Sequence, residues 1–127
     1  MKEKTLTFSL DAGKNYSLSE FSRLDTASIM NDDRHFTIFV GEKIFFDDPF
    51  FPILEFTQHA LRWISNPIHN LVFQTIDDYQ QPTLSFMRSG EEWTIFSVWQ
   101  EFECTALFQK EEIAFLIRSI ILTIIDH

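Results

Sequence analysis

The residues of this sequence that could do acid–base chemistry are carboxylates, and many of them occur in pairs. Glu101 and Glu103 lie two residues apart, and on a strand that spacing places both side chains on one face. Two carboxylates held close together separate their pKa values, which is how paired acids and bases arise in hydrolases. The other pairs are adjacent residues, which point to opposite faces of a strand. We weigh a catalytic pair at Glu101 and Glu103 against a solvated acidic edge, and the edge is favoured.

No metal-ligand or nucleophile pattern accompanies these carboxylates. No two histidines stand four residues apart, and none flanks the single cysteine, Cys104, so the spacing predicts neither a zinc nor an iron site. The sequence has no glycine-rich phosphate loop and no Gly-x-Ser-x-Gly motif. We expect His59 on an exposed helix face, His69 in a loop and Cys104 as a buried core thiol. The prediction is a protein that is not an enzyme and has no catalytic, metal-binding or cofactor-binding residues.

The composition is that of a globular chain with a strong acidic excess. The chain has 127 residues, 45% apolar and 16% aromatic, and its 10 basic and 19 acidic residues give a net charge of −9. This length predicts a single domain over residues 1–127. The negative charge argues against nucleic acid as the partner, because phosphate binding needs a cationic surface. One cysteine allows no intrachain disulfide, which favours the reducing cytoplasm.

No segment has the features of a signal peptide or a membrane span. Residues 1–5 include two lysines, but no apolar run follows them. The longest apolar segment, 113–125, has 13 residues and contains Arg118, whereas a span needs about 20 residues. We therefore expect a cytoplasmic protein with no membrane partner.

Hydrophobic periodicity predicts mainly short strands. Residues 4–10 alternate polar and apolar, the pattern of a half-buried strand. A hairpin is expected over 35–46 with its turn at Gly41-Glu42, and Asp47-Asp48-Pro49 should close its second strand because proline cannot continue a ladder. Residues 16–30 should form a short helix followed by a loop. Further strands are predicted at 70–76, 82–88 and 93–108, the last being the longest of the chain.

Two amphipathic helices are predicted, over 52–65 and 110–125. The first has a single apolar stripe and should end at Asn66-Pro67. The second carries a stripe made of Ile113, Leu116, Ile117, Ile120, Ile121 and Ile124. Strands joined by hairpins and followed by helices predict an α+β fold, with a mostly antiparallel sheet of about five to six strands and helices packed on one face.

Acidic charge is concentrated in residues 77–112. This segment holds eight carboxylates against Arg88 and Lys110, a net charge of −6. A patch of like charge destabilises a fold through self-repulsion, whereas a cationic partner neutralises it and associates faster because of it. The predicted strand 93–108 lies inside this segment, so its two faces decide what the patch presents.

One face of that predicted strand mixes aromatic and acidic side chains. It carries Trp93, Trp99, Glu101 and Glu103, while the opposite face carries Phe96, Val98 and Phe102. If helices cover the phenylalanine face, the tryptophans and glutamates are typical of a protein interface. The alternative is that at least one tryptophan is buried, which the sequence favours. The predicted contact residues are Asp77, Asp78, Glu91, Glu92, Trp93, Trp99, Glu101 and Glu103.

Four hydrophobic patterns carry a resemblance that covers roughly residues 35–125. They are Pro52-Ile53-Leu54-Glu55-Phe56 with Leu61-Arg62-Trp63, then Leu84-Ser85-Phe86, Glu92-Trp93-Thr94-Ile95 and Ser97-Val98-Trp99-Gln100, before the C-terminal amphipathic helix. Together they resemble small bacterial immunity proteins that neutralise polymorphic or contact-dependent growth-inhibition toxins. The resemblance implies a cytoplasmic antitoxin that binds one cognate protein toxin, often a basic nuclease, and occludes its active site.

Three hypotheses of function follow. The first is this toxin inhibitor, with an acidic and aromatic surface facing a cationic cleft. The second is a small-molecule-binding domain or enzyme with an aromatic pocket and Glu101, Glu103 or His69 as its polar group. The third is a structural homodimer that associates through the isoleucine-rich C-terminal helix, for which burial in the chain's own core is the favoured alternative.

Overall fold

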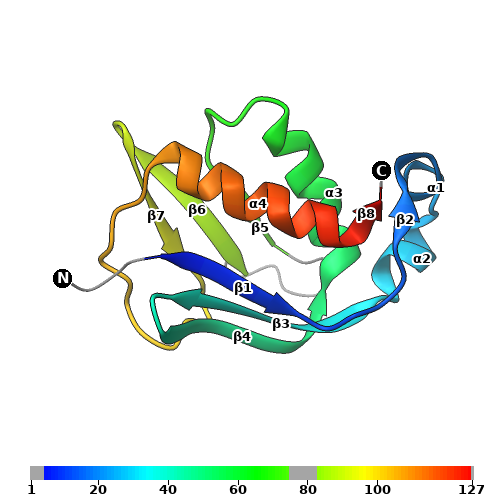
Figure 1. Ribbon diagram of the computed structural model, residues 1–127, viewed down its shortest axis with the longest axis horizontal. Coiled ribbons are helices and arrows are strands. Elements are labelled where there is room, and N and C mark those ends of the chain that lie inside the picture. The colour runs from blue at the N-terminus through cyan, green and yellow to red at the C-terminus, as the bar shows by residue number, and fades with distance from the viewer. Residues whose placement is uncertain (1–4, 75–82, 127) are drawn as a thin grey trace.

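The computed structural model describes residues 5–74 and 83–126, and its strands and helices are mixed along the chain (Figure 1). In chain order the elements are β1 (Leu6–Leu10), β2 (Tyr16–Ser17), α1 (Leu18–Ser22), α2 (Thr26–Met30), β3 (Asp33–Val40), β4 (Lys43–Pro52), α3 (Ile53–Ile64), β5 (Leu71–Phe73), β6 (Leu84–Ser89), β7 (Glu92–Phe96), α4 (Lys110–Ile124) and β8 (Ile125–Asp126).

The strands form three sheets. Two of them are antiparallel and three-stranded, in the orders β1-β3-β4 and β5-β6-β7, and β2 pairs with β8 in a short parallel ladder. Helix α4 lies alongside β1, and α3 packs against α4 and against β3 and β5 (Figure 1). The α+β fold with mostly antiparallel strands is thus confirmed, and its six antiparallel strands are divided between two sheets.

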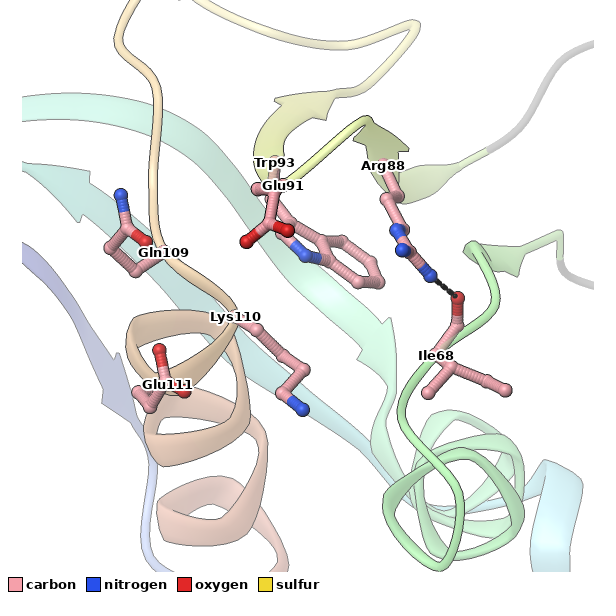
Figure 2. A pocket seen from close by; sticks show the side chains of 7 residues that line it. All are labelled: Ile68, Arg88, Glu91, Trp93, Gln109, Lys110 and Glu111. Carbon is pink, nitrogen blue, oxygen red and sulfur yellow. Dashed lines mark hydrogen bonds between the residues drawn. The ribbon is translucent and has the colours of Figure 1, made fainter.

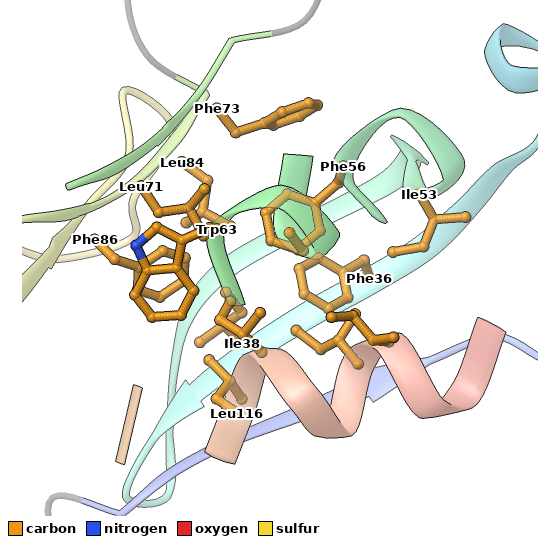
Figure 3. Packing of buried hydrophobic residues seen from close by; sticks show 14 of the residues in the cluster. Phe36, Ile38, Ile53, Phe56, Trp63, Leu71, Phe73, Leu84, Phe86 and Leu116 are labelled. Atoms are coloured by element: carbon orange, nitrogen blue, oxygen red, sulfur yellow. The ribbon is translucent and has the colours of Figure 1, made fainter. Parts of the chain in front are cut away.

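Aromatic rings from both sheets and from α3 build a shared core. Phe36 on β3 stacks on Phe51 on β4 with ring centroids 4.8 Å apart, and Phe56 on α3 meets the edge of Phe73 on β5 at 5.3 Å. Figure 3 shows Phe36, Phe56 and Phe73 together with Trp63 from α3 and Leu116 from α4. Each such ring buries about 150–250 Å², so a small number of phenylalanines joins the two sheets into one hydrophobic cluster.

The C-terminal helix follows its prediction. It starts at a capping box, in which the Gln109 N–H donates to Glu112 Oε1 at 2.7 Å. Its predicted apolar stripe is buried in the chain's own core, through Ile113, Leu116, Ile117, Ile120, Ile121 and Ile124. The face that the homodimer hypothesis would use is therefore already covered within the chain.

The predicted hairpin forms around Gly41, whose φ of 63° is a conformation that glycine tolerates at little cost. Its second strand is longer than predicted, because β4 continues through Pro49 to Pro52. The register with β3 shifts between Arg34 and Phe36. Because β4 is an edge strand, a proline in it can face away from β3 without removing a hydrogen bond of the sheet. The irregularity turns Phe50 outward, where it is 73% exposed.

Residues 16–30 form the short strand β2 and two short helices, α1 and α2, where one helix and a loop were predicted. Ser17 begins α1 with a capping box to Glu20, and Asp25 begins α2 by accepting the Ser28 N–H at 2.8 Å. Each cap satisfies backbone donors at the start of a helix, and the second cap starts a new helix where the hydrophobic period is too weak to indicate one.

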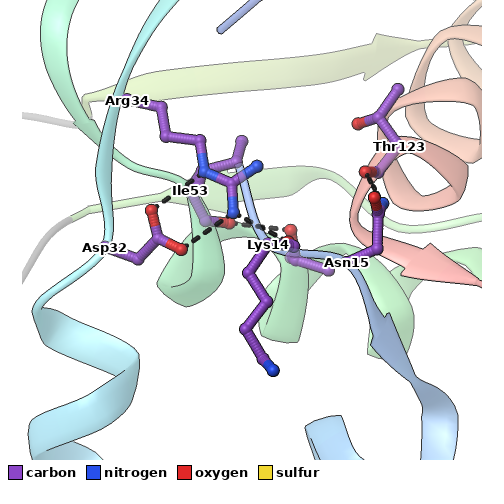
Figure 4. A network of polar contacts seen from close by, with 7 residues as sticks. Lys14, Asn15, Asp32, Arg34, Ile53 and Thr123 are labelled. Carbon is purple, nitrogen blue, oxygen red and sulfur yellow. Dashed lines mark hydrogen bonds and ion pairs between the residues drawn. The ribbon is translucent and has the colours of Figure 1, made fainter. Parts of the chain in front are cut away.

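A buried arginine holds the 11–15 loop against β3 (Figure 4). Arg34 is 6% exposed, makes a bidentate contact to Asp32 at 2.8 and 2.9 Å, and donates to the Lys14 carbonyl at 2.9 Å. A Cβ atom on Gly13 would lie 2.4 Å from Arg34 Cζ. The glycine is therefore needed for a close approach of backbone to guanidinium, which the sequence did not reveal.

The predicted long strand 93–108 is wrong, because β7 ends at Phe96. Ser97 stops it: its hydroxyl donates to the Thr83 carbonyl and accepts the Trp99 N–H, and its own N–H donates to the Gln100 side chain at 3.1 Å. The chain turns there and then runs to Phe108, which pairs with Trp93 in an isolated antiparallel bridge. Polar and apolar residues continue to alternate after Ser97. Apart from that bridge, this segment does not pair with a neighbouring strand in the described residues, so the alternation does not indicate a strand there.

Candidate functional site

Most exposed carboxylates of the second half of the chain gather at one end of the molecule, which we call the acidic end. It comprises the β3–β4 turn, the β6–β7 turn, the 97–108 segment and the start of α4, which lie together at the left of Figure 1. A hydrogen bond from the Glu101 N–H to the Phe45 carbonyl, 2.8 Å long, joins the 97–108 segment to β4. The glutamates of the acidic end are Glu42, Glu91, Glu92, Glu101, Glu103, Glu111 and Glu112.

Within the part of the chain that the structure describes, these carboxylates form no ion pair. Within the described residues the ion pairs are Arg34–Asp32 and His35–Asp47, and both lie away from the acidic end. Seven glutamates face three cations there, Lys43, Arg88 and Lys110, which leaves a net charge of −4. Glu112 is used in the helix cap, so the other carboxylates remain available to an outside partner.

Predicted contact residues on the 97–108 segment lie at the surface of the acidic end. Trp99 is 59% exposed, and Glu101 and Glu103 are exposed on an irregular segment rather than on one strand face. The paired-carboxylate geometry that a strand would impose is therefore absent at these two residues. Asp77 and Asp78 lie outside the described residues.

The favoured expectation that at least one tryptophan is buried is confirmed in β7. Trp93 is 1% exposed, with its ring against Trp63 at 5.8 Å between centroids, and Ile95 is buried beside it. Phe96, on the opposite face of β7, is 40% exposed. The exposed phenylalanine lies next to the turn that carries Trp99, so apolar contact area accompanies the acidic groups. The sequence left open which face of β7 is exposed, because both faces carry large apolar side chains.

A polar cavity of about 300 Å³ opens in the acidic end, between the β6–β7 turn and the start of α4 (Figure 2). We call it the Trp93 cavity. It is lined by Ile68, Arg88, Glu91, Trp93, Gln109, Lys110 and Glu111. Two of the predicted contact residues, Glu91 and Trp93, thus share one cavity, and the two cations of the acidic segment line it with them.

A second cavity, of about 450 Å³, lies between α2 and α3 and includes His59 in its lining. The imidazole is half-buried and meets the Phe73 ring edge-on at 5.3 Å, so the expectation of an exposed helix position is wrong. Burial, and then the nearby Arg62 charge, lower the pKa of His59. Both effects favour the neutral form of the imidazole, which packs against the Phe73 ring. Glu101 and Glu103 are not among the lining residues of this cavity.

An exposed acid–base pair lies on β3 and β4, between the two ends of the molecule. His35 Nε2 is 2.6 Å from Asp47 Oδ1, and Thr37 Oγ1 donates to the same oxygen at 2.6 Å. The hydrogen bond to Asp47 raises the pKa of His35, and the bonds from Thr37 and then from His35 lower the pKa of Asp47. Both shifts favour the charged forms of the pair.

The described residues contain no group of three or more His, Cys, Asp or Glu side chains arranged to hold a metal ion. In the described ranges no helix combines the length and the apolar character that crossing a bilayer requires. Cys104 is partly buried and packs against the hydrophobic core, close to the expectation of a core thiol. His69 lies in the loop after α3 and accepts the Trp63 indole N–H through its carbonyl.

The fold and this surface define a small α+β protein whose acidic end has no ion pair among the described residues. The chain belongs to the DUF7878 family, a domain of unknown function whose model matches residues 6–123. No curated protein and no solved structure matches the chain.

Proposed function

We propose that this protein is a bacterial immunity protein, which binds a cognate toxin domain with a basic surface and covers its active site. The observation that carries the proposal is the acidic end, which has a net charge of −4, no ion pair within the described residues, and the exposed Trp99 on its 97–108 segment. The resemblance of the hydrophobic patterns to immunity proteins of growth-inhibition systems supports it independently.

The electrostatics favour a partner whose own surface is cationic. Unpaired carboxylates at one end of a protein create a local negative potential, which steers a positive partner and raises the association rate. Nucleases carry such cationic clefts because they bind phosphates. A protein that offers carboxylates where the substrate would offer phosphates occupies the same cleft, which makes a basic nuclease-type toxin the favoured target.

The aromatic residues account for affinity once the partners have met. Hot spots of interfaces are enriched in tryptophan, surrounded by residues that exclude water. Trp99, Phe96 and Leu107 supply exposed apolar area beside the glutamates of the 97–108 segment. In this proposal the protein acts in the cytoplasm by stoichiometric binding, with no role for a cofactor, nucleic acid or membrane.

A co-expression test addresses the proposal directly. Where the gene lies immediately downstream of one for a large secreted protein with a variable C-terminal domain, that domain is the toxin candidate. We expect its expression alone to stop growth and co-expression of this chain to restore it. A purified pair should bind in calorimetry with an affinity that falls as salt rises. Failure to restore growth, or millimolar binding that ignores salt, would contradict the proposal.

A charge-reversal pair sharpens the same test. Glu101→Lys changes the charge at the acidic end, and Asp126→Lys makes the same change on β8, at the other end of the molecule. We expect the first variant to bind the toxin domain about tenfold or more weakly, because like charges would then meet across the interface. The second should bind like the natural chain. Equal effects of the two variants would show that the acidic end is not the interface.

A further inference from the structure

We infer that the Trp93 cavity receives one basic side chain, with its adjoining peptide carbonyl, from a loop of the protein partner. This inference rests on the proposed function and names the contact through which the acidic end would recognise its target. It follows from three observations: an indole N–H without a partner, charges that do not pair across the cavity, and a rim held open by an arginine.

The indole of Trp93 leaves its one polar atom available to the cavity. The residue is 1% exposed, yet its Nε1–H donates to no acceptor among the described residues, whereas the Trp63 Nε1–H donates to the His69 carbonyl at 2.7 Å. Every fully buried polar side-chain atom in the described ranges has a partner, so the Trp93 nitrogen is not fully buried, and Trp93 lines the cavity. Figure 2 shows its nitrogen on the side of Glu91 and Lys110. An indole N–H is a donor only, so the occupant must bring an acceptor.

Charged side chains of both signs line the cavity, and within the described residues they do not form ion pairs with one another. Glu91, Lys110 and Glu111 all line it, and none of the three takes part in an ion pair within the described part of the chain. A ligand with a cationic group and an acceptor oxygen can pair with all of these groups. Its cation binds the carboxylates of Glu91 and Glu111, and its oxygen accepts hydrogen bonds from Lys110 and the indole N–H. A basic residue in a peptide has both groups within one residue.

Arg88 fixes the rim of the cavity. Its Nε donates to the Gly90 carbonyl at 2.8 Å, its Nη1 to the Ile68 carbonyl at 2.9 Å, and its N–H to Asn70 Oδ1 at 2.7 Å. These bonds join the β6–β7 turn to the loop that follows α3, as Figure 2 shows for the bond to Ile68. The cavity is thus formed before any ligand arrives, which lowers the ordering cost of binding.

The surroundings favour a partner's basic residue over other occupants. At about 300 Å³ the cavity is at the lower limit for small-molecule sites, which span about 300–1,000 Å³, so it suits one side chain better than a cofactor. The acidic end around it carries a net charge of −4, which repels an acidic residue and attracts a basic one. A free amino acid shares part of this chemistry and is distinguished in the test.

The test uses the three indole N–H signals of the ¹⁵N-labelled full-length chain, from Trp63, Trp93 and Trp99. The probe is N-acetyl-arginine methylamide, compared with N-acetyl-glutamate methylamide and with free arginine. We expect the blocked arginine to shift the Trp93 signal in a saturable way. The Trp63 signal, whose N–H is already bonded, should stay in place, and the exposed Trp99 reports non-specific binding.

Matched variants locate the effect. Glu91→Gln and Glu111→Gln should each weaken the blocked-arginine titration at least threefold, whereas Glu103→Gln, at the acidic end but outside the cavity lining, should leave it unchanged. Trp93→Phe assigns the signal where it folds, and through-bond assignment replaces it where it does not. No shift of the Trp93 signal, an equal shift with the glutamate probe, or a shift with free arginine alone would overturn the inference.

The outcomes separate the inference from the proposed function. If co-expression restores growth and Glu101→Lys weakens the complex while the Trp93 signal ignores blocked arginine, the inference fails and the immunity function stands. If blocked arginine binds the cavity but no toxin domain is neutralised, the proposed function fails while the binding chemistry of the cavity stands.

Discussion

The two ends of this molecule carry similar side chains and use them in opposite ways. At the end formed by α1, α2, β2 and β8, which we call the capped end and which lies at the right of Figure 1, Glu20 and Asp25 accept backbone N–H groups of helix starts. Those hydrogen bonds lower the pKa of both carboxyls. At the acidic end, most carboxylates accept no such bond and have no ion pair in the described residues.

The difference shows that the number of carboxylates in a segment says little about its role. Over residues 14–30 the charges cancel, with Lys14 and Arg23 against Glu20 and Asp25, and the carboxylates there serve the fold. The acidic end keeps its charge uncompensated, although like charges repel. A surface that tolerates this repulsion is a candidate for a role outside the fold, and the variants below test that division.

The largest expected effect on stability comes from the loop beside the capped end. Gly13→Ala would push a methyl group to 2.4 Å from Arg34 Cζ, and such overpacking of a buried group costs about 1–3 kcal/mol. Gly90→Ala is the matched control at the acidic end: its φ is 63° and no atom lies within 4 Å of the added Cβ, so only backbone strain of about 1 kcal/mol is expected. Urea unfolding of both variants measures the difference, and a larger loss for Gly90→Ala would contradict it.

A helix cap should matter more than an acidic-end carboxylate. Ser17→Ala removes the acceptor for the Glu20 N–H, 3.1 Å away, and loss of such a cap costs about 1 kcal/mol. Glu103→Ala removes an exposed side chain without a hydrogen bond in the described residues, and such surface changes stay within about 0.5 kcal/mol. Thermal unfolding of both variants measures the two changes in stability. Equal losses of stability would contradict the distinction between the two ends.

The His35–Asp47 pair makes stability depend on pH. Asp47 raises the pKa of His35, so the stabilisation is fully present below the pKa of an unfolded histidine, about 6.5. It is lost as pH rises through the higher pKa of the folded state. Unfolding midpoints measured from pH 5.5 to 9 should therefore fall across that window in the natural chain and less steeply in His35→Gln. Identical slopes would show that the pair does not couple to folding.

Sequence patterns predicted correctly those elements in which the period of apolar residues matches the side chains that are buried. The stripe of α4 and the hairpin around Gly41 were found because burial follows the pattern directly. The predicted strand 93–108 failed because side-chain hydrogen bonds of Ser97 turn the chain, and periodicity contains no information about such bonds. The acidic character of the site was visible in composition.

The Trp93 cavity was not predictable from spacing, because it depends on contacts between distant segments. Arg88 reaches the Ile68 carbonyl across 20 positions of sequence, and Lys110 lines the cavity from another element. Two of its residues, Glu91 and Trp93, were expected at a partner contact, Trp93 on the face of a long strand that begins just after Glu91. The sequence predicted which segment of the chain holds these residues. The cavity itself forms only when the fold brings distant segments together.

The smallest expected stability effect has an informative sign. Glu103→Gln removes one of seven like-charged glutamates at the acidic end, so relief of repulsion should leave the free energy of unfolding unchanged or raise it by less than about 0.5 kcal/mol at low salt. Adding salt should reduce this gain, because screening weakens repulsion in both proteins. Unfolding in denaturant at low and high salt measures it. A clear loss of stability would mean that this carboxylate supports the fold, as Glu20 does, and would remove the main reason for assigning the acidic end to a partner.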